Sequence, residues 1–133
     1  MIELSASLGW MFAERPFLER FEAAARAGYR AVEFPFAFAH DLRDLASAAH
    51  SARLEVVTFN AGVGDWMAGE RGLACHPARR AEFAEELERA LEYADALGCR
   101  FLTLISGVRP TDFAKADIHW ALIQNIRHAA ARC

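Results

Sequence analysis

The sequence has no long apolar run, and its N-terminal MIELSASLGW carries no basic residue. A membrane span would need roughly 18 consecutive apolar residues, and a signal peptide would begin with a positively charged stretch. Neither is found, so we expect a cytoplasmic protein without a membrane partner.

Blocks of like charge and closely spaced cysteines are also missing. Acids and bases alternate along the chain and leave a net charge of -3, which argues against binding to nucleic acid. Cys75, Cys99 and Cys133 form no CxxC pair, so neither a disulfide framework nor a structural zinc site is indicated. We expect reduced thiols with a structural role.

Apolar residues are plentiful, at 54% of 133 residues, and 25% of the chain is charged. This balance is typical of a soluble globular protein, and the length suits a single domain over residues 1–133. Four short segments rich in β-prone residues each precede a helical pattern. The strands are expected at 2–8, 31–36, 55–60 and 100–106, and the helices at 16–27, 41–53, 77–97 and 116–131.

The alternation of strand and helix, repeated four times, predicts an α/β protein with a parallel sheet. Residues 27–32 and 97–102 share the order apolar, Gly, any residue, Arg, apolar, apolar, which indicates a repeated unit. A small doubly wound sheet is one possibility. The other is half of a (β/α)8 barrel, since a whole barrel needs about 250 residues.

In both architectures the functional residues follow the carboxyl ends of the strands. This rule selects Trp10, Glu33, Asn60 and Ser106 as candidate substrate-binding residues. Glu33 either orients a substrate or forms an ion pair that supports the fold. Asn60 offers an amide donor and acceptor to a polar substrate, or it terminates its strand.

The stretch GVGDWMAGERGLA lies in a long loop, at about residues 61–76, after the third strand. It lacks the lysine and hydroxyl of a P-loop, and Asp65 and Glu70 would repel phosphate. Because loops of this length often act as lids, we expect Asp65, Trp66, Glu70 and Arg71 to cover a substrate. Arg71 is suited to binding a substrate carboxylate bidentately.

Other titratable residues give no sign of a metal or catalytic site. The five histidines show no HxxxH or HExxH spacing. The acids of the third helix are expected on its solvated face; they are Glu82, Glu85, Glu86 and Glu88.

The loop sequence, from Asn60 through Gly64-Asp65-Trp66 to Gly69-Glu70-Arg71-Gly72, resembles that of hydroxypyruvate isomerases. These enzymes belong to the sugar isomerase/epimerase group of TIM barrels. Further similar stretches are 6–12, 17–21, 27–34, 90–94, 107–110 and 125–130. The resemblance spans nearly the whole chain but only the N-terminal half of the barrel, as four consecutive βα units.

The resemblance implies an aldose-ketose isomerisation between hydroxypyruvate and tartronate semialdehyde, in carbohydrate and glyoxylate metabolism. It also implies a divalent cation, Mg or Mn, and catalytic carboxylates on strands five to eight. No catalytic residue or metal ligand of the family therefore falls in this chain, which alone is expected to be inactive.

A half-barrel would expose two strand edges, so we expect a homodimer, a complementing second half-barrel, or a truncated product. A small hydroxy acid, keto acid or sugar is the expected substrate. Two alternatives stay open. One is a catalytically silent half-barrel that binds or assembles, and the other is a related enzyme such as a ketose epimerase or inosose dehydratase.

Overall fold

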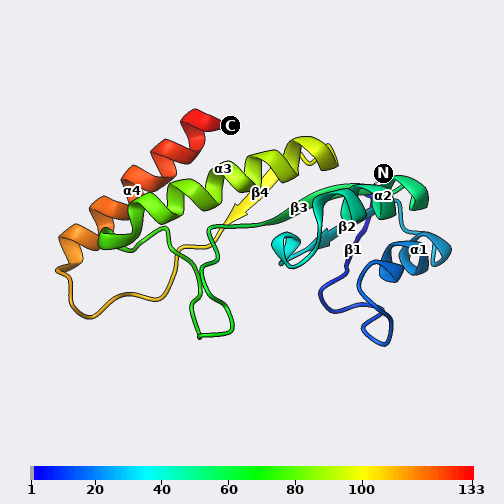
Figure 1. Ribbon diagram of the computed structural model, residues 1–133, viewed down its shortest axis with the longest axis horizontal. Coiled ribbons are helices and arrows are strands. Elements are labelled where there is room, and N and C mark those ends of the chain that lie inside the picture. The colour runs from blue at the N-terminus through cyan, green and yellow to red at the C-terminus, as the bar shows by residue number, and fades with distance from the viewer. Residues whose placement is uncertain (1) are drawn as a thin grey trace. The chain divides into compact units, whose positions relative to one another are not determined.

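The computed structural model describes residues 2–133 and contains four strands and four α-helices in strict alternation (Figure 1). The strands are β1 (Ser5–Ser7), β2 (Ala31–Phe34), β3 (Glu55–Ala61) and β4 (Phe101–Leu104). The helices are α1 (Glu19–Arg26), α2 (Leu42–Ala52), α3 (Arg80–Leu97) and α4 (Lys115–Arg132), with short 3-10 turns η1 (Ala37–Ala39) and η2 (Pro77–Arg79). The predicted series of four βα units is confirmed.

Local sequence explains where the helices begin. Asp41 caps α2 as expected, because its side chain accepts hydrogen bonds from the backbone amides of Arg43 and Asp44. The predicted start of the first helix at Pro16 is three residues early. There the amide of Glu19 donates to the carbonyl of Pro16, an i to i−3 bond that forms a tighter turn before α1.

The strands form one sheet in the order β1-β2-β3-β4, and the pairs β1/β2 and β2/β3 are parallel. Between β2 and β3 the register shifts by one residue: Val32 is opposite Val56, but Glu33 is opposite Thr58. Val57 is thus the extra residue of a bulge. As a result Val56 and Phe59 both lie on the covered face of the sheet.

The chain divides into two compact units. The first unit comprises residues up to Asn60 together with Glu92–Leu102, and its core is aromatic. Phe21 of α1 packs edge-on against Phe34 of β2 at 5.7 Å between ring centroids, and Phe34 stacks on Phe59 of β3 at 6.2 Å. These contacts fix α1 over one face of the sheet.

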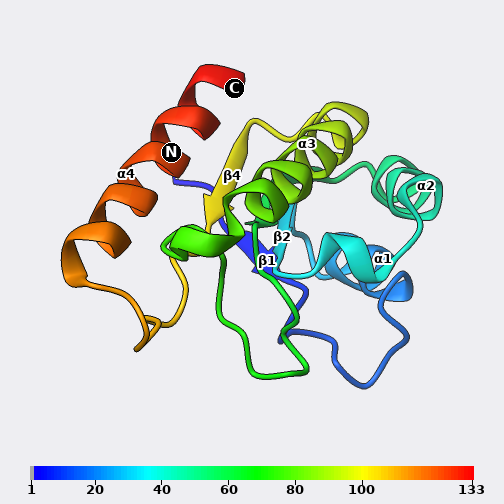
Figure 2. The ribbon, with the colours of Figure 1, turned by 60° about the vertical axis from the view of Figure 1, so that its left-hand side comes forward.

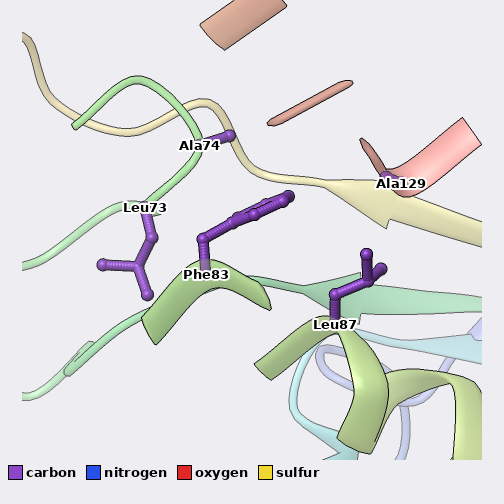
Figure 3. Close-up of a cluster of buried hydrophobic side chains, with 5 residues drawn as sticks. All are labelled: Leu73, Ala74, Phe83, Leu87 and Ala129. Carbon is purple, nitrogen blue, oxygen red and sulfur yellow. The ribbon is translucent and has the colours of Figure 1, made fainter. Parts of the chain in front are cut away.

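The second unit comprises Ala61–Leu91 and Thr103–Cys133, and its core joins the long loop to two helices. Figure 3 shows the buried side chains that form it, which are Leu73, Ala74, Phe83, Leu87 and Ala129. Leu73 and Ala74 belong to the C-terminal end of the long loop, so this part of the loop is anchored in a hydrophobic core.

None of the helices in the described part of the chain has the length and apolar character needed to cross a membrane. The cysteines are free thiols, with Cys75 buried, Cys99 half-buried and Cys133 exposed.

Candidate functional site

Glu33 and Asn60 lie at the carboxyl ends of neighbouring strands in the first unit. Val32 and Phe34 are buried on the helix-covered face, and strand alternation places Glu33 on the opposite face. Thr58 is paired with Glu33, and Asn60 follows two positions later on that same face. The structure therefore brings together two of the predicted substrate-binding residues on one side of the sheet.

The side chain of Glu33 is half-buried and forms no ion pair among residues 2–133. Of the two roles considered for this carboxylate, the ion pair that supports the fold is not observed. Asn60 is also half-buried, and it lies within β3, one residue before the strand ends at Ala61. A role in terminating the strand is thus not required of it.

Trp10 lies in the β1–α1 connection of the same unit and is 82% exposed. Arg20 of α1 holds this connection by donating hydrogen bonds to three carbonyl groups, those of Leu8 at 2.8 Å, Arg15 at 3.0 Å and Ala13 at 3.4 Å. Sequence reasoning missed this role of Arg20, because nothing in the spacing of an exposed-looking arginine indicates which carbonyls it will meet.

In the second unit, the long loop closes on itself at its base. The amide of Gly72 donates to the carbonyl of Val63, and that of Leu73 donates to the carbonyl of Gly62. The two ends of the loop therefore run side by side, as Figure 1 shows for the green segment that projects after β3. At the tip, Met67 is 93% exposed.

Ser106 follows β4 and meets the C-terminal end of this loop. It pairs with Gly72 in an isolated antiparallel bridge, and its carbonyl accepts a hydrogen bond from the amide of Cys75 at 2.8 Å. The predicted substrate residue Ser106 and the predicted lid are therefore in direct backbone contact.

Glu70 fastens the loop to the helix that follows. Its carboxylate pairs with the guanidinium of Arg79, which also binds Glu82 at 2.6 Å. The carboxylate of Glu70 also accepts a hydrogen bond from the backbone amide of Asp65 at 2.5 Å. The hydrogen bond from Arg79, followed by the one from Asp65, lowers the pKa of Glu70 below its ordinary value. Arg79 lowers the pKa of Glu82 in the same way.

The expectation that the acids of the third helix all face water is wrong for Glu86. The side chain of Glu82 is 45% exposed while it pairs with Arg79. Glu86 is half-buried beneath the loop and accepts a hydrogen bond from the amide of Gly64 at 3.4 Å, and burial raises the pKa of its carboxyl. The sequence alone does not reveal that the loop folds back over this part of α3.

Arg71 and Trp66 form a second contact inside the loop. The guanidinium lies 4.0 Å from the ring centroid of Trp66, and its Nη1 donates to the carbonyls of Trp66 at 3.1 Å and Glu70 at 2.6 Å. The carboxylate of Asp65 accepts a hydrogen bond from the backbone amide of Ala68 at 3.0 Å. These contacts connect Asp65 to Glu70, Glu70 to Arg71 and Arg71 to Trp66 within the loop.

Arg79→Ala is expected to speed amide hydrogen exchange in residues 65–72 by about fivefold at neutral pH, which corresponds to about 1 kcal/mol for a part-exposed bidentate pair. Hydrogen exchange followed by mass spectrometry measures this. Arg127→Ala is the matched control, because Arg127 is an exposed arginine of α4 that forms no ion pair among residues 2–133. Equal exchange in both variants would contradict the role given to Arg79.

The same pair predicts a pH dependence. A carboxylate whose folded pKa is lowered stabilises the folded state above its unfolded pKa, and this contribution is lost as the pH falls through the folded value. The Arg79→Ala variant and the unchanged protein should therefore differ fully in the hydrogen exchange of residues 65–72 above a pH of about 4.5. This difference should shrink below that pH.

Comparison with known proteins places this arrangement in a family. Residues 21–133 match the family described as Xylose isomerase-like TIM barrel. The chain belongs to this family. Within it, the chain is 42% identical to hydroxypyruvate isomerase of Escherichia coli (strain K12) and 41% identical to 2-oxo-tetronate isomerase of Cupriavidus necator, over 130 residues in each case.

Both alignments cover 98% of this chain but 50% of the relative. A crystal structure described as AP endonuclease, family 2, from Brucella melitensis superposes with a TM-score of 0.95 at 41% identity, over 99% of this chain and 51% of the other. The chain therefore spans about half the length of the relatives it matches, in agreement with the half-barrel predicted from the sequence.

Among residues 2–133 no group of three or more His, Cys, Asp or Glu side chains is arranged to hold a metal ion. The residues present here thus do not form the divalent-cation site that the family resemblance implies.

Proposed function

We propose that this chain supplies the N-terminal, substrate-binding half of a hydroxypyruvate isomerase-like barrel. The observation that carries the proposal is the similarity to a hydroxypyruvate isomerase along 98% of the chain at 42% identity. The reaction would convert hydroxypyruvate to tartronate semialdehyde. One proton leaves C3 and an enediolate forms. One proton is then delivered to C2, while the hydroxyl proton of the C3 oxygen passes to the C2 oxygen, so that no oxidant or reductant is needed.

The residues of the first unit are suited to the polar part of such a substrate. Glu33 and Asn60 share one face of the sheet at the carboxyl ends of β2 and β3, where ligands of parallel α/β folds bind. The carboxylate of Glu33 accepts hydrogen bonds from substrate hydroxyls, and the amide of Asn60 both donates and accepts. Trp10 contributes an exposed aromatic surface.

Arg71 is suited to the carboxylate of the substrate. Its Nη1 is occupied by the carbonyls of Trp66 and Glu70, whereas Nε and Nη2 make no hydrogen bond within the described residues. These two atoms form one edge of the guanidinium and can donate two parallel hydrogen bonds to a carboxylate. The stacking on Trp66 fixes the plane in which that edge lies.

The proposal assigns the catalytic carboxylates and the divalent cation to a second half-barrel. Helix α4 leaves large apolar side chains exposed, Trp120 at 55%, Ile123 at 48% and Ile126 at 47%. β4 is an end strand of the sheet and would pair with a fifth strand. A complementing half-barrel would cover these groups; a second copy of this chain is the alternative partner.

Nucleic acid is a weaker proposal for the ligand, despite the description of the Brucella melitensis protein as an AP endonuclease. The net charge of this chain is -3, with no block of basic residues to neutralise a phosphate backbone.

Arg71→Lys tests the proposed carboxylate contact in a barrel completed with the second half of the Escherichia coli enzyme. Lysine keeps the charge but cannot donate the parallel pair of hydrogen bonds, so KM for hydroxypyruvate should rise about tenfold with a smaller change in kcat. Arg43→Lys, on α2, is the matched control and should leave KM unchanged. A KM unaffected by Arg71→Lys would remove Arg71 from the substrate site.

A further inference from the structure

A cavity of about 440 Å³ lies in the second unit, between the β4–α4 connection and the first two turns of α4. Figure 2 shows the connection, in yellow and orange, leading into α4. Most of the lining is basic, small or apolar, and it contains no acid; the residues are Cys75, Ser106, Gly107, Arg109, Lys115, Ile118, His119 and Leu122.

Three of these side chains are basic. Arg109 comes from the connection, while Lys115 and His119 lie one turn apart on α4, so they are on the same side of the helix. Lys115 is the only lysine in the sequence. None of the three forms an ion pair among residues 2–133.

Two acids lie close to this group in the sequence, and neither forms an ion pair with it among residues 2–133. Asp112 accepts a hydrogen bond from the hydroxyl of Thr111 at 3.1 Å, and neither residue lines the cavity. Asp117 lies in the first turn of α4, two positions from Lys115, and it is also outside the lining. Residues two apart on a helix point in different directions.

The backbone adds to the positive potential. Helix α4 has 18 residues, and its N-cap, Ala114, makes no side-chain hydrogen bond to the first turn. The amides of Asp117 and Ile118 donate to the carbonyl of Ala114, whereas those of Lys115 and Ala116 have no acceptor among the described backbone groups. Free amides at the N-terminus of a helix attract anions.

We propose that this cavity binds the oxyanion group, carboxylate or phosphate, of a small metabolite. Arg109 and Lys115 supply charge-assisted hydrogen bonds, and His119 and the Ser106 hydroxyl supply further donors. Ile118 and Leu122 form an apolar wall for a short carbon skeleton. This site uses none of the groups assigned to substrate above except Ser106, and it requires no turnover, so it stands or falls independently of the isomerase activity.

The single lysine permits a direct test on the chain as it exists. Reductive methylation with 13C-formaldehyde keeps the positive charge and yields two NMR signals, one from Lys115 and one from the N-terminal amine. Titration with inorganic phosphate, and separately with D-glycerate as the carboxylate, should shift the Lys115 signal saturably at constant ionic strength. Chloride should produce no saturable shift, and the N-terminal signal is the internal control.

Arg109→Ala should weaken the binding of the preferred anion about tenfold, the loss expected for one charge-assisted hydrogen bond. Arg127→Ala, on α4 but outside the cavity lining, should leave the binding unchanged, and circular dichroism verifies that both variants fold. Tighter binding of phosphate or of glycerate identifies the oxyanion. The proposal is overturned if chloride competes equally, if neither anion saturates, or if the two variants weaken binding alike.

Discussion

Gly72→Ala is expected to lower the free energy of unfolding by on the order of 3 kcal/mol, through backbone strain and steric overlap together. Gly72 has a φ of 113°, a conformation that residues with a Cβ rarely adopt. A Cβ at this position would also overlap the carbonyl oxygen of Ile105 and lie 2.7 Å from the amide nitrogen of Gly107. These are backbone atoms, which cannot turn aside as a flexible side chain would.

Gly69→Ala separates the two causes. Gly69 also has a positive φ, of 93°, but a Cβ there would have no atom within 4 Å. Replacing Gly69 should therefore lower the free energy of unfolding by about 1 kcal/mol, from backbone strain alone. Denaturant unfolding followed by circular dichroism measures both variants. Equal losses would mean that the approach of the loop to the residues after β4 does not contribute to stability.

Much of the fold could be predicted from the sequence because each element carries a local signal. The β-prone segments, the Asp41 cap and the glycine that follows each of two helices mark the four βα units in order. The ends of elements were less certain. The turn before α1 and the 3-10 turn before α3 depend on i to i−3 hydrogen bonds that proline positions alone do not specify.

The candidate site was predicted in part. The rule that ligands bind at strand ends selected Glu33 and Asn60, which the structure places on the same face of the sheet. The roles of Arg20, Arg79 and Glu86 were missed, because each depends on which backbone or side-chain group the folded loop brings near. Of these three roles, only the ion pair of Arg79 is indicated by the sequence, because Arg79 lies three residues before Glu82.

The long loop was predicted as a lid, and its substrate-facing role stays a prediction. Its internal hydrogen bonds, its buried residues Leu73 and Ala74 and its ion pair with Arg79 describe a folded segment with an exposed tip. A loop of this kind is preorganised, so it would position Arg71 before the substrate arrives.

The central claim is that this chain is one half of an isomerase barrel whose proton-transferring carboxylates lie in the other half. The expected effect is large, because a barrel without its general base loses the step that forms the enediolate. The second half of the Escherichia coli hydroxypyruvate isomerase is a suitable complement, because this chain aligns with 50% of that enzyme at 42% identity.

The most direct test is to measure hydroxypyruvate turnover with Mg or Mn, using NMR to detect tartronate semialdehyde. The three samples are this chain, the complementing half and their equimolar mixture. We predict product from the mixture only, with a complex that contains one copy of each half by light scattering. Turnover by this chain alone would contradict the account, and so would a correctly assembled complex that forms no tartronate semialdehyde.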